Sequence, residues 1–209
     1  MKEMEEIERA YHSIAPYFDL WVRIVEIGTR KQEALEHASA RPQKVLIVSP
    51  PTDAGIPLLA EANSGGSTTL VCFSERLRII AEAYQRARRI HTGFVVMPHF
   101  ARGFADATFA TIYVNCFFDF CPDKGVGPIA RELRRILKPG GKLYAVYMDV
   151  PSNVVGHFWA WLFATFKTLS GGCHPVSMRK ALLDVGFAIE TDNHQERAGF
   201  PMRYTVARG

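Results

Sequence analysis

The sequence lacks an apolar run long enough to cross a membrane. Its nearest approach, from Val154 to Phe166, falls short of the roughly 18 apolar residues that a spanning helix needs, and it contains His157. The first residues, MKEMEEIERAYHS, also lack the basic start and apolar stretch of a secretory signal. We therefore expect no transmembrane segment and a cytoplasmic location.

Strong charge of one sign and paired cysteines are missing as well. The 209 residues carry a formal net charge of only +4, which is too weak a field to predict a nucleic-acid partner. No two cysteines form a C-x-x-C pair, so nothing in their spacing supports a metal site. We expect reduced and mostly buried thiols at Cys72, Cys116, Cys121 and Cys173.

What the sequence does have is a regular alternation of short apolar runs and amphipathic stretches. After a helical prefix, the apolar runs predict a buried strand at 45–48 and further strands at 68–73, 93–97, 108–115 and 142–148. The amphipathic stretches between them predict helices at 56–62, 75–89 and 129–137, the last one ended by a turn at 139–141. An aromatic stretch after Asp149, a helix ending at Gly186 and two closing strands complete the chain.

This alternation is typical of an α/β protein with a Rossmann-like, doubly wound sheet that is covered by helices on both faces. The two closing strands, 188–191 and 202–207, follow each other closely and predict a hairpin, hence an antiparallel partner at one edge of the sheet. We expect a single domain over 1–209. Its parts are an N-terminal helical cover at 1–40, the Rossmann-like core at 44–150, and an aromatic segment, late helix and closing hairpin at 151–209.

Two motifs in the middle of the chain resemble a known family. RGFADATFATIYVNCFFDFCPD, from Arg102 to Asp123, and the following IARELRRILKPGGKLYAV are similar to the central half of class I S-adenosylmethionine (SAM)-dependent methyltransferases. The nearest type is the ubiquinone/menaquinone C-methyltransferase. The resemblance implies a seven-stranded sheet with its last strand antiparallel, and SAM lying across the carboxyl ends of the first strands.

The cofactor-binding motifs of this chain are degenerate relative to that family. The first strand and its loop, VLIVSPPTDAG, carry Ser49 and Pro51 where the family has glycines, and prolines neither donate an NH nor adopt positive φ. Cys72 stands where the family has an acid that binds the ribose. The resemblance nevertheless implies a set of cofactor-binding positions: Ser49, Thr52, Gly55, Cys72, Phe73, His99, Phe100 and Asn115.

Methyl transfer needs alignment of an acceptor with the methyl group more than it needs catalytic side chains. His99, Asn115 and His157 are the candidate catalytic residues, because imidazole can take up a proton near neutral pH and Asn115 matches a family position beside the reacting centre. Asp119 also follows a strand at its carboxyl end. Phe18, Phe118, Trp159 and Trp161 are the candidate substrate-binding residues.

The aromatic segment HFWAWLFATF favours a hydrophobic acceptor, quinol-like or aromatic. The same segment could instead form a lid on the core, a homodimer contact or a peripheral membrane contact. The first hypothesis is a SAM-dependent methyltransferase acting on such a molecule. The alternatives are a methyltransferase-fold protein that has lost SAM binding and holds a ligand or a partner, and an enzyme that performs other chemistry in a quinone-like pathway.

Overall fold

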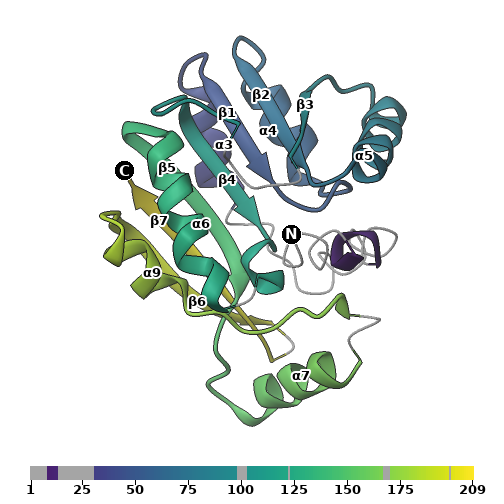
Figure 1. Cartoon of the computed structure of the whole chain (residues 1–209), viewed down its shortest axis with the longest axis vertical. Helices are drawn as coiled ribbons and strands as arrows, with labels where there is room; N and C mark the ends of the chain where they lie inside the picture. The colour runs from purple at the N-terminus through teal and green to yellow at the C-terminus, as the bar shows by residue number, and fades with distance from the viewer. Residues whose placement is uncertain (1–8, 14–30, 98–102, 122, 167–169, 198) are drawn as a thin grey trace.

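The computed structural model describes residues 9–13, 31–97, 103–121, 123–166, 170–197 and 199–209. Its centre is a seven-stranded sheet in the order β3-β2-β1-β4-β5-β7-β6 (Figure 1). The strands are β1 (Lys44–Val48), β2 (Ser67–Cys72), β3 (Gly93–Val96), β4 (Phe109–Asn115), β5 (Leu137–Met148), β6 (Ala188–Arg197) and β7 (Phe200–Arg208). The first five run parallel, while β7 is antiparallel to both β5 and β6. The predicted fold class is therefore confirmed.

Helices cover both faces of the sheet. They are α3 (Lys31–Ser39), α4 (Gly55–Ala62), α5 (Glu75–Arg88), α6 (Asp123–Ile136), α7 (Val154–Thr165), α9 (Met178–Asp184) and the short 3-10 helix η2 (Phe118–Phe120). In Figure 1, α6 and α9 lie in front of the sheet, and α3 and α4 lie behind it. The described part of the predicted N-terminal cover is helical at 9–13 and in α3.

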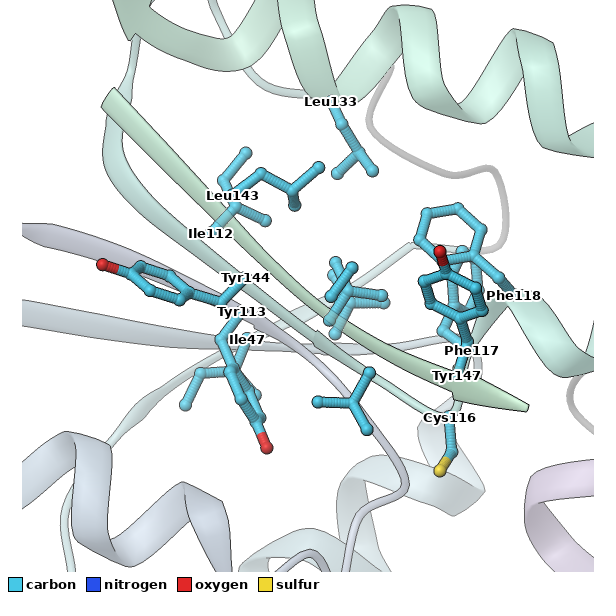
Figure 2. Close-up of a cluster of buried hydrophobic side chains, with 14 of the residues drawn as sticks. Ile47, Ile112, Tyr113, Cys116, Phe117, Phe118, Leu133, Leu143, Tyr144 and Tyr147 are labelled. Atoms are coloured by element: carbon cyan, nitrogen blue, oxygen red, sulfur yellow. The ribbon is translucent and has the colours of Figure 1, made fainter. Parts of the chain in front are cut away.

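The core follows the side-chain alternation of the strands. Ile112 of β4 and Leu143 of β5 point toward Leu133 of α6, whereas Tyr113 and Tyr144 point to the opposite face (Figure 2). These side chains are almost fully buried, as expected for parallel strands covered on both sides. On that opposite face the ring of Tyr144 lies 5.9 Å from the ring of His37, which belongs to α3.

Two local predictions differ from the structure. The sequence pattern placed a turn at 139–141, but these residues lie inside β5, because Leu137 pairs with Phe109 before the register shifts. Gly140 adopts φ +74°, and its NH donates to the carbonyl of Gly209, so the glycine ties this irregular stretch to the chain end. Helix α6 also begins at Asp123, earlier than the predicted start at Ile129.

Side-chain caps explain where two of the helices begin. The hydroxyl of Ser74 accepts from the NH of Leu77 at the start of α5, and Asn153 Oδ1 accepts from the NH of Gly156 at the start of α7. Among the helices of the described ranges, none has both the length and the apolar character needed to cross a membrane.

Candidate functional site at the carboxyl edge of the sheet

The strand order places the candidate site between β1 and β4. From β1 the chain moves outward to β2 and β3, and then returns to β4 on the other side of β1. In doubly wound sheets, ligands bind at this reversal, beyond the carboxyl ends of the strands. The loops that follow β1, β2 and β4 therefore form the edge on which a cofactor would lie, and we call this region the carboxyl edge.

The loop after β1 is closed by its own hydrogen bonds. Pro50 and Pro51 are buried, and the NH of Asp53 donates to the carbonyl of Pro50 at 3.0 Å. The Asp53 carboxylate is fully buried, and its Oδ1 accepts from the NH of Gly55 at 2.7 Å. The two prolines thus form a compact turn, from which α4 starts at Gly55.

Asn115 joins this loop to the end of β4. Its Nδ2 donates to Asp53 Oδ2 at 2.8 Å, and its Oδ1 accepts from the thiol of Cys116 at 3.4 Å. Cys116 has φ 47°, an unusual conformation for a residue other than glycine, and such outliers cluster at functional sites. Both the nitrogen and the oxygen of the Asn115 amide therefore have partners, and these contacts join the loop after β1 to the end of β4.

Four aromatic rings close over the carboxyl edge, and we call them the aromatic cap: Tyr11, Phe73, Phe117 and Phe120. Phe73, at the end of β2, stacks on Phe117 with ring centres 5.3 Å apart. Tyr11 lies 5.7 Å from Phe73 and 5.6 Å from Phe120, and its hydroxyl donates to the carbonyl of Cys116 at 3.3 Å. Burial, more than the neighbouring thiols and carboxyls, raises the pKa of Tyr11 well above its usual value.

Asp119 is a buried acid at the same edge. It is 1% exposed, and its Oδ1 accepts from the NH of Met148 at the end of β5. Burial raises the pKa of Asp119 to about 7, although the hydrogen bond from Met148 acts in the opposite direction. Asp119 can therefore gain or lose a proton near neutral pH, which is what a general base requires.

The sequence-predicted residues fall into three groups. Seven lie at the carboxyl ends of the strands, or in the loops and helices that follow directly: Ser49, Thr52, Gly55, Cys72, Phe73, Asn115 and Phe118. Three lie outside the described residues: Phe18, His99 and Phe100. Three lie on α7, which packs on β7: His157 and Trp161 are exposed, and Trp159 is partly buried. The described cofactor-binding candidates thus lie together at the carboxyl edge, whereas the catalytic candidate His157 lies on α7.

Cys72 occupies the position where the related family has its ribose-binding acid. Its side chain is 2% exposed, and burial raises the pKa of the thiol to about 12. Cys72 is therefore neutral at physiological pH and can only be a weak hydrogen-bond partner. Phe73, the next residue, contributes an aromatic face to the cap.

Sequence reasoning missed a charged cluster at the other end of this edge, which we call the β7 network: Asp149, Asp192, His194, Glu196 and Arg203. His194 Nδ1 lies 2.6 Å from Asp149 Oδ2, and its Nε2 lies 3.0 Å from Glu196 Oε1. The guanidinium of Arg203 binds Asp149 at 2.7 Å and Asp192 at 3.2 Å. The polar residues at alternate positions 192, 194 and 196 of the last hairpin were the available signal.

The comparisons with known proteins agree with this geometry. A family model described as a methyltransferase domain matches residues 52–145. A SAM-dependent methyltransferase from Methanosarcina mazei superposes with a TM-score of 0.63 at 21% identity, over 82% of this chain and 95% of that one. This chain has the class I methyltransferase fold.

Further neighbours of this methyltransferase fold point the same way. A SAM-dependent methyltransferase from Aquifex aeolicus gives a TM-score of 0.61 at 13% identity, over 90% of this chain and 91% of that one. Geranyl diphosphate methyltransferase, solved in complex with SAM, gives a TM-score of 0.63 at 15% identity, over 85% of this chain and 83% of that one. A search of curated proteins gave no match. SAM is named for the Methanosarcina mazei and Aquifex aeolicus proteins and is bound in the geranyl diphosphate methyltransferase structure.

Within the described ranges, no three His, Cys, Asp or Glu side chains are grouped so that they could hold a metal ion. The cysteines of the carboxyl edge are free thiols, and Cys116 and Cys121 are buried there.

Proposed function

We propose that this protein is a SAM-dependent methyltransferase that modifies a hydrophobic small molecule, either aromatic or quinol-like. The observation that carries this proposal is the buried carboxylate of Asp53 beside the aromatic cap, at the reversal point of the sheet. SAM carries a sulfonium and an ammonium group. Carboxylates and aromatic faces are the groups that attract such cations.

The described residues fit the cationic and adenine parts of SAM. Asp53 offers a carboxylate that accepts from Gly55 NH and Asn115 Nδ2, and Phe73 offers a ring face for the adenine. Ser49 and Thr52 add hydroxyl groups on the same loop. When bound, SAM supplies the methyl group that the acceptor receives.

The carboxylate and ribose of SAM would be held less tightly by this loop than by a glycine-rich one. Pro50 and Pro51 have no NH to donate, the NH groups of Asp53 and Gly55 bond within the loop, and Cys72 is uncharged. His99, which lies outside the described residues, stays a predicted cofactor-binding residue near the adenine. We expect the recognition of SAM by this chain to rest mainly on charge attraction and ring contacts.

The aromatic cap also has to open for a cofactor to enter. Tyr11 is 1% exposed and fills the space between Phe73 and Phe120. Among the described residues, its hydroxyl bonds to the carbonyl of Cys116. Displacement of the helical segment 9–13 would expose ring faces for the adenosyl group and shield the bound cofactor from water on return.

The acceptor site belongs, in this proposal, to the aromatic region beyond β4 and β5. The rings of Trp159 and Phe163, both of α7, lie 5.9 and 5.6 Å from the ring of Phe200 in β7, and 6.0 Å from each other. Such a wall suits a flat apolar molecule. Asp119 joins His99 and His157 as a candidate to accept the proton of a hydroxyl acceptor, because its pKa lies near 7.

The ubiquinone and menaquinone type remains the nearest family type by motif, and it supports a quinol-like acceptor. The family match does not favour the alternatives, in which the fold has lost SAM binding or performs other chemistry.

Calorimetric titration of the full chain with SAM and with its demethylated product tests the cofactor part. A ligand at 100 times its Kd adds about 2.7 kcal/mol, which raises the Tm of a chain of this size by roughly 5 to 10 °C. Asp53→Asn should weaken SAM binding about 10- to 100-fold, because the loss of one charged partner costs about 1.5–3 kcal/mol. Transfer of a labelled methyl group to quinols, phenols and polar acceptors tests the acceptor class.

Asp106→Asn is the matched control, since it makes the same change at a side chain that is 78% exposed and pairs with Arg135. It should leave SAM binding unchanged. If neither SAM nor its product binds the wild-type chain, methyl transfer is excluded. If both bind but Asp53→Asn binds equally well, the role of Asp53 is wrong while the function stands.

A further inference from the structure

Helix α7 carries an apolar face that the rest of the described chain does not cover. Its inner side is anchored by Phe163, which is 9% exposed and lies 5.6 Å from Phe200 of β7. On the other side are five large apolar side chains, which we call the outer face of α7: Val154, Val155, Phe158, Trp161 and Phe166. They are 83%, 50%, 52%, 58% and 48% exposed, respectively.

The outer face forms a continuous stripe rather than scattered exposed residues. Val154, Phe158 and Trp161 follow the i, i+4, i+7 spacing of one helix side, and the rings of Phe158 and Trp161 are 5.9 Å apart. Between Val154 and Phe166 the sequence has no Asp, Glu, Lys or Arg. A surface helix normally places charged residues on its solvent side, and a helix that is apolar all round is normally buried.

The size of the outer face argues against a second copy of the chain as its occupant. Its five side chains expose on the order of 500 Å² in total, given that an aromatic side chain offers about 150–250 Å². A stable protein interface needs about 800 Å² from each partner. Helix α7 also lies at one end of the molecule (Figure 1), so few neighbouring residues could enlarge the contact.

A lipid bilayer can bind an exposed apolar face of this size, because binding to a bilayer requires no minimum contact area. Each Å² of apolar surface that leaves water contributes about 25 cal/mol, so even a single helix face provides a useful affinity. Valine and phenylalanine enter the acyl boundary, and the amphipathic ring of Trp161 suits the headgroup level. The helix would then lie in the plane of the interface and would not cross it.

The charges around α7 allow contact with anionic headgroups. Glu196 is the carboxylate at the start of the helix, and it accepts hydrogen bonds from Ser152 Oγ at 2.6 Å and from Asn153 Nδ2. Together with His194, these donors hold the pKa of Glu196 below its usual value, so the carboxylate stays ionised and hydrogen-bonded within the protein. The chain as a whole is cationic, with a formal net charge of +4.

We propose that the outer face of α7 docks onto the surface of a lipid bilayer. Docking would bring the carboxyl edge of the sheet close to the bilayer, in which an apolar acceptor dissolves. The proposal does not depend on SAM binding, because it rests only on the exposure, spacing and charge of α7.

Vesicle sedimentation of the full chain tests the proposal, with vesicles of phosphatidylcholine alone and of phosphatidylcholine mixed with phosphatidylserine. The wild-type chain should bind both kinds, and Phe158→Ser combined with Trp161→Ser should reduce binding at least tenfold. Leu58→Ser combined with Ile79→Ser is the matched control, because it removes two exposed apolar side chains from α4 and α5. This control should bind as the wild type does.

Tryptophan fluorescence gives a second readout that does not depend on the double variant's stability. Vesicles should shift the emission of the wild type to the blue and should have a much smaller effect on Trp161→Phe. Absence of vesicle binding by the wild type overturns the proposal. So does binding that needs phosphatidylserine and survives the double variant, or a solution dimer that the double variant disrupts.

Discussion

The carboxyl group of Asp119 shows how burial sets the chemistry of a single residue. At 1% exposure the charged form loses its hydration, and the hydrogen bonds from the NH of Met148, from its own NH and from Cys116 replace only part of it. The pKa of about 7 follows from that imbalance. Because the pKa is higher in the folded chain than in the unfolded one, Asp119 contributes most to stability below pH 3.8. That contribution is lost as the pH rises to about 7.

Asp119→Asn should therefore stabilise the protein at neutral pH. Asparagine keeps an oxygen for the Met148 NH and never ionises, so its advantage should grow between about pH 4 and 8 and stay constant above. The gain in unfolding free energy at pH 8 should reach roughly 2–4 kcal/mol. Urea unfolding at several pH values measures it, with Asp106→Asn as a control that should show no such growth. A difference that does not change with pH would contradict the buried ionisation.

Single residues at the site were only partly predictable from the sequence. Asn115 was identified from its motif, and it does lie at the end of β4, but its partner Asp53 is 62 positions away and no local pattern indicates that bond. The positive φ of Cys116 could not be predicted either, because the sequence indicates that conformation mainly through glycine. Long-range contacts and backbone exceptions are set by tertiary packing, which periodicity does not report.

At the scale of elements, the β7 network connects the start of α7 to the last hairpin. His194 lies between Asp149 and Glu196, and both hydrogen bonds raise the pKa of the imidazole. Burial alone would raise the pKa of Asp149, but hydrogen bonds from Arg203 and His194 outweigh it and lower the value. Since Glu196 accepts from Ser152 and Asn153, the protonation of His194 bears on how firmly α7 is attached.

The stability of this attachment should fall as the pH rises above neutrality. The folded pKa of His194 lies above 6.5, so its contribution is complete below about pH 6.5 and is lost as the pH rises through the folded value. Between pH 7 and 9 the wild type should lose about 1 kcal/mol of unfolding free energy, a figure discounted for the exposure of the ring. His194→Gln should abolish this loss. Asp119 still titrates up to about pH 8, but it does so equally in the wild type and in His194→Gln, so its contribution cancels when the two are compared.

Thermal unfolding from pH 7 to 9 measures this effect. His91→Gln is the control, because His91 is exposed at the far side of the sheet, and it should keep the wild-type slope. A His194→Gln variant that follows the same slope as the wild type would rule out the imidazolium as the source.

Elements were the level at which sequence patterns worked best. Apolar runs predicted all the parallel strands, because central strands that are buried on both faces, such as β1, read as continuous Val, Ile and Leu, while the edge strand β3 keeps two valines. The stretch LKPGG was less clear, since proline and glycine indicate a turn, whereas pairing of Leu137 with Phe109 extends β5 through it. The outer face of α7 was visible as an aromatic excess, but only the fold determines which side of the helix faces away from β7.

At the scale of the whole molecule, the last strand in sequence is an inner strand of the sheet. β7 lies between β5 and β6, with paired residues from Lys142–Arg208 to Met148–Met202 on one side and from Ala188–Arg208 to Arg197–Phe200 on the other. The chain therefore completes its sheet only when residues 200–208 are in place. The single domain stays a prediction, and it is consistent with this strand order because β5 and β6 are joined only through β7.

We accordingly expect one cooperative unfolding transition for the full chain. The transitions followed by far-UV and near-UV circular dichroism should coincide, and calorimetry should give an unfolding enthalpy of about 150 kcal/mol near 60 °C that equals the van't Hoff value. Deletion of 200–209 should abolish the near-UV signal, because β5 then loses one neighbour and β6 loses its pairing with β7. Two separate transitions, or a truncated chain that still unfolds cooperatively, would show that 44–150 folds as an independent domain.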